Sequence, residues 1–258
     1  MSRIIAIANQ KGGVGKTTTA INLSAALAQR GQSVLVVDCD PQGNASSGFA
    51  VRPGSKEPSL YQFLFEENGA APIVRPLAEL TLALLPANSS LVAAELELLS
   101  HDQRETLLRN RLNGLRASYG YILLDCPPSL GLLTVNALTA AQSVLIPLQC
   151  EYFALEGLSL LLETIRRIKI RLNPSLLIEG VLLTMFDRRN NLSHQVANEI
   201  RGHLKFNVFK TMIPRNVRLS ESPSHGLPVM LYDPQCVGSK AYAALADEIL
   251  ARGTHHER

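Results

Sequence analysis

Short apolar runs rich in β-branched residues alternate with longer stretches of helical periodicity along most of the chain. This alternation is typical of βαβ units and predicts an α/β fold, a mainly parallel twisted sheet with helices on both faces. Strands are expected at residues 4–9, 33–38, 121–125, 143–148, 178–185 and 208–213. Helices are expected at residues 16–29, 105–118, 155–171, 193–204 and 237–250, and Gly31 is expected to end the first of them.

Residues 51–80 interrupt the alternation, because Pro53, Pro58, Pro72 and Pro76 break weak helical signals. We expect this stretch to be an elaborated surface connection. A length of 258 residues suits one α/β domain, and no linker divides the chain. The sequence therefore predicts a single domain over residues 1–252 and a flexible tail over residues 253–258.

Composition limits the class of protein more than it identifies it. Hydrophobic residues make up 46% of the chain, which is enough for a sizeable core, and the formal net charge of +3 indicates nucleic-acid binding only if it is concentrated locally. The cysteines are far apart, which favours reduced core thiols; they are Cys39, Cys126, Cys150 and Cys236. No apolar run approaches the roughly 20 residues that span a bilayer, so we expect a cytoplasmic protein.

A glycine-rich segment joins the first predicted strand to the first predicted helix. It reads Lys11-Gly12-Gly13-Val14-Gly15-Lys16-Thr17-Thr18. Backbone N–H groups in this context can surround an anion at a helix N-terminus. We expect residues 11–18 to bind the phosphates of ATP, with Lys16 at the terminal phosphates and the Thr17 hydroxyl as a ligand of Mg²⁺. The alternative is a glycine-rich turn with two surface lysines.

The loop departs from the strict pattern GxxxxGK[ST], because Gln10 stands where the first glycine belongs. The run KGGVGKTT instead resembles the deviant Walker A motif of the ParA/MinD group of P-loop ATPases. The resemblance implies a P-loop NTPase fold in which Lys11 reaches the nucleotide of a partner subunit. It therefore implies catalytic roles for Lys11 and Lys16, and a homodimer in the ATP-bound state.

Two carboxylates follow the second predicted strand, in the run Asp38-Cys39-Asp40-Pro41-Gln42-Gly43-Asn44. The carboxyl end of a buried strand beside the phosphate loop is a place where magnesium-bound water can be oriented. The matching segment of the ParA family supplies the carboxylate that positions the attacking water. The resemblance thus implies that Asp40 is catalytic and that Asp38 acts on the metal through its bound water. A simple turn is the alternative.

A third carboxylate ends the run Tyr121-Ile122-Leu123-Leu124-Asp125, which resembles a Walker B segment. Core strands often show this pattern by chance, but beside a phosphate loop it indicates that Asp125 holds Mg²⁺ through water. Further along, residues 213–226 resemble a signature of chromosomal ParA (Soj) proteins in which Pro and Asn contact adenine. The resemblance assigns that role to Pro214 and Asn216, and a strand end with a turn is the alternative.

Positive charge is concentrated late in the chain. Glu199 is the acid that opposes the basic residues of this stretch, which are Arg188, Arg189, Arg201, Lys205, Lys210, Arg215 and Arg218. Such a surface suits nonspecific, salt-dependent binding of double-stranded DNA, and a solvated face without a partner is the alternative. The ParA relatives carry DNA-contacting basic residues at the positions of Arg189 and Arg218. We expect the DNA surface to comprise Arg188, Arg189, Lys205, Lys210 and Arg218.

The resemblance to ParA/Soj proteins extends from Lys11 to the last predicted helix. It implies a nucleoid-associated DNA-partitioning switch that hydrolyses ATP when a ParB-type partner stimulates it. A related ATPase that positions a protein cargo and a noncatalytic scaffold stay open as alternatives. A MinD-like membrane switch is disfavoured, because residues 241–252 contain Asp247 and Glu248 rather than a basic amphipathic helix.

Overall fold

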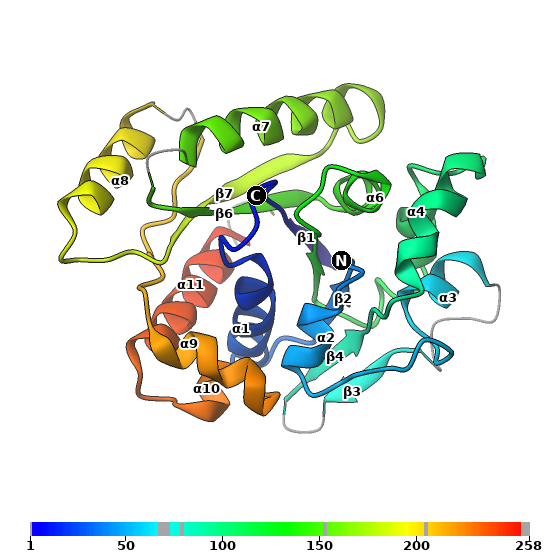
Figure 1. Ribbon diagram of the computed structural model, residues 1–258, viewed down its shortest axis with the longest axis horizontal. Coiled ribbons are helices and arrows are strands. Elements are labelled where there is room, and N and C mark those ends of the chain that lie inside the picture. Colours follow the sequence, from blue (N-terminus) through cyan, green and yellow to red (C-terminus); the bar gives the residue numbers. More distant parts are fainter. Residues whose placement is uncertain (1, 67–72, 78–79, 152–153, 204–205, 254–258) are drawn as a thin grey trace.

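The computed structural model describes residues 2–66, 73–77, 80–151, 154–203 and 206–253, and these residues form one central sheet with helices around it (Figure 1). The sheet has seven strands in the order β3-β4-β2-β5-β1-β6-β7. The strands are β1 (Arg3–Ile7), β2 (Val34–Asp38), β3 (Arg75–Leu77), β4 (Leu82–Leu85), β5 (Tyr121–Asp125), β6 (Ser143–Gln149) and β7 (Leu177–Thr184). All neighbouring pairs are parallel except β3 and β4. The predicted fold class is therefore confirmed.

The helices lie on both faces of the sheet, as the sequence predicts (Figure 1). They are α1 (Lys16–Ala28), α2 (Asn44–Gly48), α3 (Leu60–Phe65), α4 (Leu91–Ser100), α5 (Leu107–Leu112), α6 (Leu132–Ala140), α7 (Ala154–Arg171), α8 (Asn191–His203), α9 (Val217–Glu221), the short 3₁₀ helix η1 (Ser222–His225), α10 (Val229–Tyr232) and α11 (Val237–Gly253). Gly31 follows α1 with φ +77°, in the left-handed conformation that commonly ends a helix.

Strand β1 shows how the alternation of side chains divides the core. Ile4, Ala6 and Ala8 point into an apolar cluster with α4, α6 and α7, whereas Ile5 and Ile7 point into a second cluster with α1 and α11. Buried on both faces, β1 is apolar from Ile4 to its end, as central strands of parallel sheets are. The polar residues of this region lie in the loop that follows the carboxyl end of β1.

The strand expected at residues 208–213 is wrong. This segment runs beside β7, but it is joined to it by isolated bridges, Val181 with Val208 and Phe186 with Pro214. The backbone N–H groups of Lys210 and Thr211 instead donate to the carboxylate of Glu248 in α11. Backbone hydrogen bonds to β7 remain at the two ends, from the N–H of Phe209 to Val181 and from the N–H of Ile213 to Leu183. Between them Glu248 takes the N–H of Thr211, so no continuous strand forms.

Other boundaries differ for local reasons. The helix expected at residues 105–118 is only α5, since Asn113 and Gly114 follow its last turn. Residues 51–80 include α3, which begins with a capping box between Ser59 and Gln62, and β3. Helix α6 was not predicted, because its residues are almost uniformly apolar or small and show no amphipathic period.

Because the sheet joins strands from residue 3 to residue 184 and α11 packs on α1, we propose that residues 1–252 act as one domain. Gly253 ends α11, and the remainder of the expected tail, residues 254–258, lies outside the described residues. Among the helices described, none combines the length and apolar character that a membrane crossing requires.

Candidate functional site

The loop between β1 and α1 is shaped by glycine. Gly13 and Gly15 adopt φ values of +73° and +89°, a region that side-chain-bearing residues rarely enter. Gly15 is the N-cap of α1, and its carbonyl accepts the N–H of Thr19 at 2.9 Å. The loop is tied to the sheet by Thr184 at the end of β7, whose hydroxyl donates to the carbonyl of Val14 at 2.8 Å. The glycine loop at a helix N-terminus that the sequence predicts is thus present.

Lys16 is the first residue of α1 and lies almost fully buried under the loop. Its exposed fraction is 7%, and its Nζ donates to the carbonyl of Lys11 at 3.0 Å. Burial lowers the pKa of the Lys16 ammonium, while the neighbouring Asp125 carboxylate acts in the opposite direction. The positive charge of Lys16 is therefore held at the loop beside the carboxylates.

The strands bring the predicted carboxylates together. Asp38 and Asp125 are register partners on the adjacent strands β2 and β5, so both emerge at the edge of the sheet that carries the loop. Both are fully buried. Asp38 is firmly bound: its Oδ2 accepts from the backbone N–H of Ser46 at 2.8 Å and from the Ser46 hydroxyl at 2.7 Å, and its Oδ1 accepts from the N–H of Asp40 at 3.2 Å.

Asp125 is different, because neither of its carboxylate oxygens has a hydrogen-bond partner among the described residues. Burial raises the pKa of Asp125 well above its ordinary value, and the nearby Asp38 raises it further. Burial likewise raises the pKa of Asp38, to about 6, against the hydrogen bonds from Ser46. Buried acceptors that lack donors, grouped with other acids, fit a hydrated divalent cation bound to oxygen ligands. The side chain of Thr17, half-buried at the start of α1, is close enough to Asp125 to lower the pKa of its carboxyl group.

Asp40 lies two residues beyond β2 and is 7% exposed. Its Oδ1 accepts from the N–H of Gln42 at 2.9 Å, which orients the carboxylate within the turn that leads to α2. Asp40 is close enough that its carboxylate raises the pKa of both Asp125 and Lys16. The structure thus brings Lys16, Asp40 and Asp125 into one cluster beside the loop.

A pocket of about 330 Å³ adjoins the loop on the side of α11. Its lining includes Gly15 and Thr18 from the loop and α1, Pro214 and Asn216 from the segment after β7, and Tyr242 from α11. Asn216 also begins α9, since its side-chain oxygen accepts the N–H of Arg218 at 2.9 Å. Both residues expected to recognise a base therefore face a pocket continuous with the phosphate loop.

Lys11 begins the loop and is not among the residues that line this pocket. Its Nζ donates to Glu151 Oε2 at 2.6 Å, and the two side chains are 42% and 48% exposed. The first lysine of the loop is therefore near the surface, in contrast to the buried Lys16.

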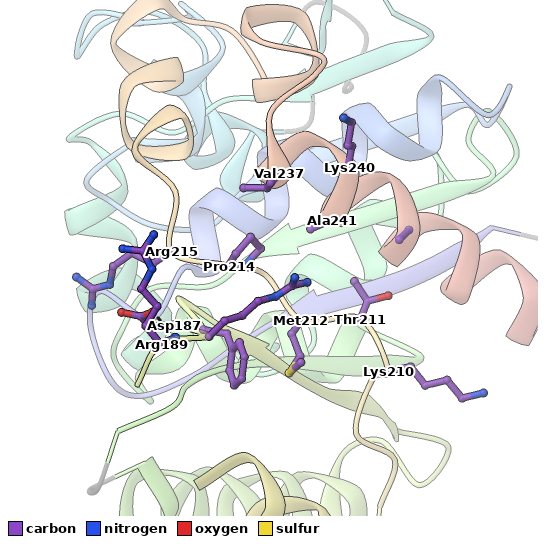
Figure 2. A pocket seen from close by; sticks show the side chains of 13 residues that line it. Asp187, Arg189, Lys210, Thr211, Met212, Pro214, Arg215, Val237, Lys240 and Ala241 are labelled. Carbon is purple, nitrogen blue, oxygen red and sulfur yellow. Dashed lines mark hydrogen bonds between the residues drawn. The ribbon is translucent and has the colours of Figure 1, made fainter. Parts of the chain in front are cut away.

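A groove of about 760 Å³ collects most of the predicted basic surface (Figure 2). Figure 2 shows Arg189 and Arg215 on one side of the groove and Lys210 and Lys240 at other points of its wall. The exposed cations that line it are Arg188, Arg189, Lys210, Arg215 and Lys240, and Asp187 is the acid among the lining residues.

Arg218 does not line this groove. It forms ion pairs with Glu221 at 2.8 Å and with Asp233 at 3.3 Å. Lys205, also expected at the DNA surface, lies outside the described residues. Of the residues predicted for the DNA surface, Arg188, Arg189 and Lys210 thus line this groove, and Arg218 is ion-paired outside it.

Three functional candidates were missed from the sequence. Ser46 binds Asp38 from eight residues away, Thr184 holds the loop from β7, and Lys240 adds a cation to the groove from α11. Of these three residues, only Lys240 could have been identified from the sequence, because it is a lone basic residue near the start of a predicted helix. The other two hydroxyls could be found only once the strands were placed side by side.

The sheet order, the glycine loop between β1 and α1, and the carboxylates on β2 and β5 define a P-loop ATPase. Residues 2–178 match the family model described as an AAA domain. The chain is 52% identical to the sporulation initiation inhibitor protein Soj of Bacillus subtilis (strain 168), covering 98% of this chain and 100% of that protein. It is 53% identical to the chromosome partitioning protein ParA of Myxococcus xanthus (strain DK1622), covering 98% and 90%.

Among solved structures, the chain is similar to cobyrinic acid a,c-diamide synthase from Mycobacterium smegmatis with bound ADP and magnesium. The TM-score is 0.87 at 36% identity, with 98% of this chain and 96% of that chain covered. The chain belongs to the Soj/ParA family of chromosome-partitioning ATPases.

Proposed function

We propose that this ATPase is a DNA-partitioning switch. It binds ATP with Mg²⁺, closes as a nucleotide-sandwich homodimer, binds double-stranded DNA without sequence preference, and returns to the monomer when a ParB-type partner stimulates hydrolysis. Its place in the cell is the nucleoid, and its cargo is a chromosome or plasmid. This function accounts for both the nucleotide site and the basic groove.

The geometry of the loop supports the nucleotide roles that we propose. Residues 11–18 surround the phosphates, Lys16 neutralises the terminal phosphates, and Pro214 and Asn216 contact the base. Thr17 and Asp125 hold Mg²⁺, directly and through water, and Asp38 supports them from β2. Asp40 positions the attacking water. The bound metal supplies charge neutralisation to the transferring phosphoryl group.

The proposed link between nucleotide and DNA rests on one observation. The pocket beside the phosphate loop and the basic groove share lining residues. Pro214 and Arg215 line both, and α11 contributes Tyr242 to the pocket and Lys240 to the groove. A nucleotide in the pocket therefore lies directly against the segment that presents cations to DNA. Exposed arginine and lysine side chains around a groove suit phosphate contacts without base readout.

The homodimer explains how nucleotide controls DNA affinity. Each protomer offers one basic groove, so closing two protomers doubles the phosphate contacts available to one DNA molecule. Because ATP favours the dimer and the dimer favours DNA, the two binding equilibria are thermodynamically linked. In this dimer Lys11 reaches the partner's nucleotide, a role that its exposure at the rim of the loop supports.

A membrane-bound switch is not favoured. The apolar face of α11 is used within the protomer, since Leu245, Ala246 and Ile249 are fully buried in the cluster that includes α1. Its outer face carries Asp247, paired with Arg30. A helix arranged in this way has no apolar face left to insert into a bilayer.

The DNA surface is tested by Arg189→Glu in a salt series of DNA binding. We expect the variant to lose most ATP-dependent affinity and the slope of log affinity against log salt to become shallower by about 1 for each lost phosphate contact, hence by at least about 2 in the dimer. Arg167→Glu is the matched control, because Arg167 is an exposed arginine on α7 outside the groove. An unchanged slope for Arg189→Glu would place the DNA surface elsewhere.

A further inference from the structure

The side chain of Lys11 is held by its own protomer. The ion pair between Lys11 Nζ and Glu151 Oε2, at 2.6 Å, joins residues 140 positions apart. They meet because β1 and β6 are neighbours in the sheet: Lys11 follows the end of β1, and Glu151 follows the end of β6. The contact is therefore a product of the sheet order and not of local sequence.

The end of β6 also holds the main chain of Lys11. Asn9, 3% exposed, donates its Nδ2 to the carbonyl of Pro147 at 2.7 Å and accepts the N–H of Lys11 on its Oδ1 at 3.0 Å. Glu151 is itself fixed by a tight turn in which its N–H donates to the carbonyl of Gln149 at 2.8 Å. One segment, residues 147–151, thus orients both the backbone and the ammonium group of Lys11.

We propose that Glu151 is a positioning residue that keeps Lys11 within its own protomer and thereby opposes closure of the homodimer. The inference rests on the proposed function, in which Lys11 crosses to the nucleotide of the partner. An ammonium group 2.6 Å from a carboxylate within its own chain must leave that carboxylate to contact a phosphate of another subunit. Closure therefore breaks the pair once in each protomer.

The ion pair can weaken dimer formation but is not strong enough to prevent it. Ion pairs this exposed change an equilibrium by only about 1.4- to 5-fold each. Two of them in a symmetric dimer change its dissociation constant by about 2- to 30-fold. The highly charged phosphates of a bound nucleotide can outweigh such a contact, whereas a chance encounter of two protomers cannot.

The test is the dissociation constant of the dimer, measured by sedimentation with a nonhydrolysable ATP analogue and Mg²⁺, for the parent chain and for Glu151→Gln. We expect the variant to form the dimer about 2- to 30-fold more tightly. The gain should shrink as salt rises from 0.1 M towards 1 M, because exposed ion pairs are screened there. Glu151→Asp, which keeps the charge, should stay nearer the parent.

Glu163→Gln is the matched control, since Glu163 is an exposed glutamate paired with Arg167 on α7, and it should leave the dimer unchanged. The affinity of monomeric protein for the analogue, measured at low protein concentration, should be the same in Glu151→Gln and the parent. A rise there that equals the gain in dimer affinity would overturn the proposal, because Glu151 would then act on its own protomer's nucleotide.

The dimer measurement separates a failure of the proposed function from a failure of the role of Glu151. If the parent chain stays monomeric with the analogue, the proposed function is wrong and the role of Glu151 falls with it. If the parent forms a dimer and Glu151→Gln forms it equally or less tightly, the proposed function stands and the restraint on Lys11 by Glu151 is refuted.

Discussion

Replacing Ser46 by alanine tests how the structure positions Asp38. The Ser46 hydroxyl donates to Asp38 Oδ2 at 2.7 Å and accepts the N–H of Ala87 at 3.0 Å, and all three residues are buried. A hydrogen bond to a charged group contributes about 1.5–3 kcal/mol, and an unpaired buried N–H costs about 1–3 kcal/mol. Because the backbone N–H of Ser46 still binds Asp38, we expect a net loss of about 3 kcal/mol.

The loss is measured by urea unfolding at pH 8 and by thermal unfolding. About 3 kcal/mol corresponds to a fall in Tm of about 6–12 °C for a chain of this size. Ser47→Ala is the matched control, since Ser47 stands next in α2 and its hydroxyl makes one exposed bond to the carbonyl of Asn44. It should change the free energy of unfolding by less than about 0.5 kcal/mol.

The dependence of the loss on pH adds a second check. Burial raises the pKa of Asp38 to about 6, so its contribution to folding stability is lost as pH rises from about 4 through 6. Without the Ser46 hydroxyl the pKa rises further, and the stability of the variant should fall more steeply over this window than that of the parent. If Ser46→Ala matched Ser47→Ala at pH 8, or fell less steeply with pH than the parent, the assigned hydrogen bonds would be wrong.

Other substitutions test the remaining parts of the site. Asp125→Asn should raise the Tm of the nucleotide-free protein, because it removes a buried unpartnered charge, and should abolish the further rise that Mg²⁺ gives with ATP; a preserved rise would contradict the metal role. Tyr242→Phe should cost about 1 kcal/mol in urea unfolding, through loss of the 3.1 Å hydrogen bond with Thr19, and no loss would refute that bond. Lys16→Ala should lose nucleotide binding in calorimetry, and Asp40→Ala should bind ATP but lose turnover in a phosphate-release assay; parental behaviour of either would remove that residue from the site.

The sequence predicts the catalytic edge of the sheet well, because each motif follows a strand whose apolar pattern is clear. Asp38 and Asp125 end runs of buried β-branched or leucine residues, and the glycines between Lys11 and Lys16 require a loop. Since the carboxyl ends of parallel strands meet at one edge, the fold class alone brings these segments together.

The rest depends on contacts between distant segments. Strand β4 consists of leucine and alanine, which favour helices as readily as strands, and its pairing with β2 and β3 decides the outcome. Residues 208–213 have the composition of a strand, yet Glu248 takes two of their N–H groups. The ion pair of Arg218 with Asp233 likewise depends on tertiary structure, so a count of basic residues could not separate Arg218 from Arg189.

In the proposed switch, the nucleotide state sets the affinity for DNA. The direct measurement is the binding of a random-sequence DNA duplex, at one fixed salt concentration, by the protein loaded with Mg²⁺ and either a nonhydrolysable ATP analogue or ADP. We expect at least about tenfold tighter binding with the ATP analogue, because two grooves then act on one duplex, and we expect Lys11→Ala to remove this difference. Equal affinities in the two nucleotide states would contradict the proposed switch.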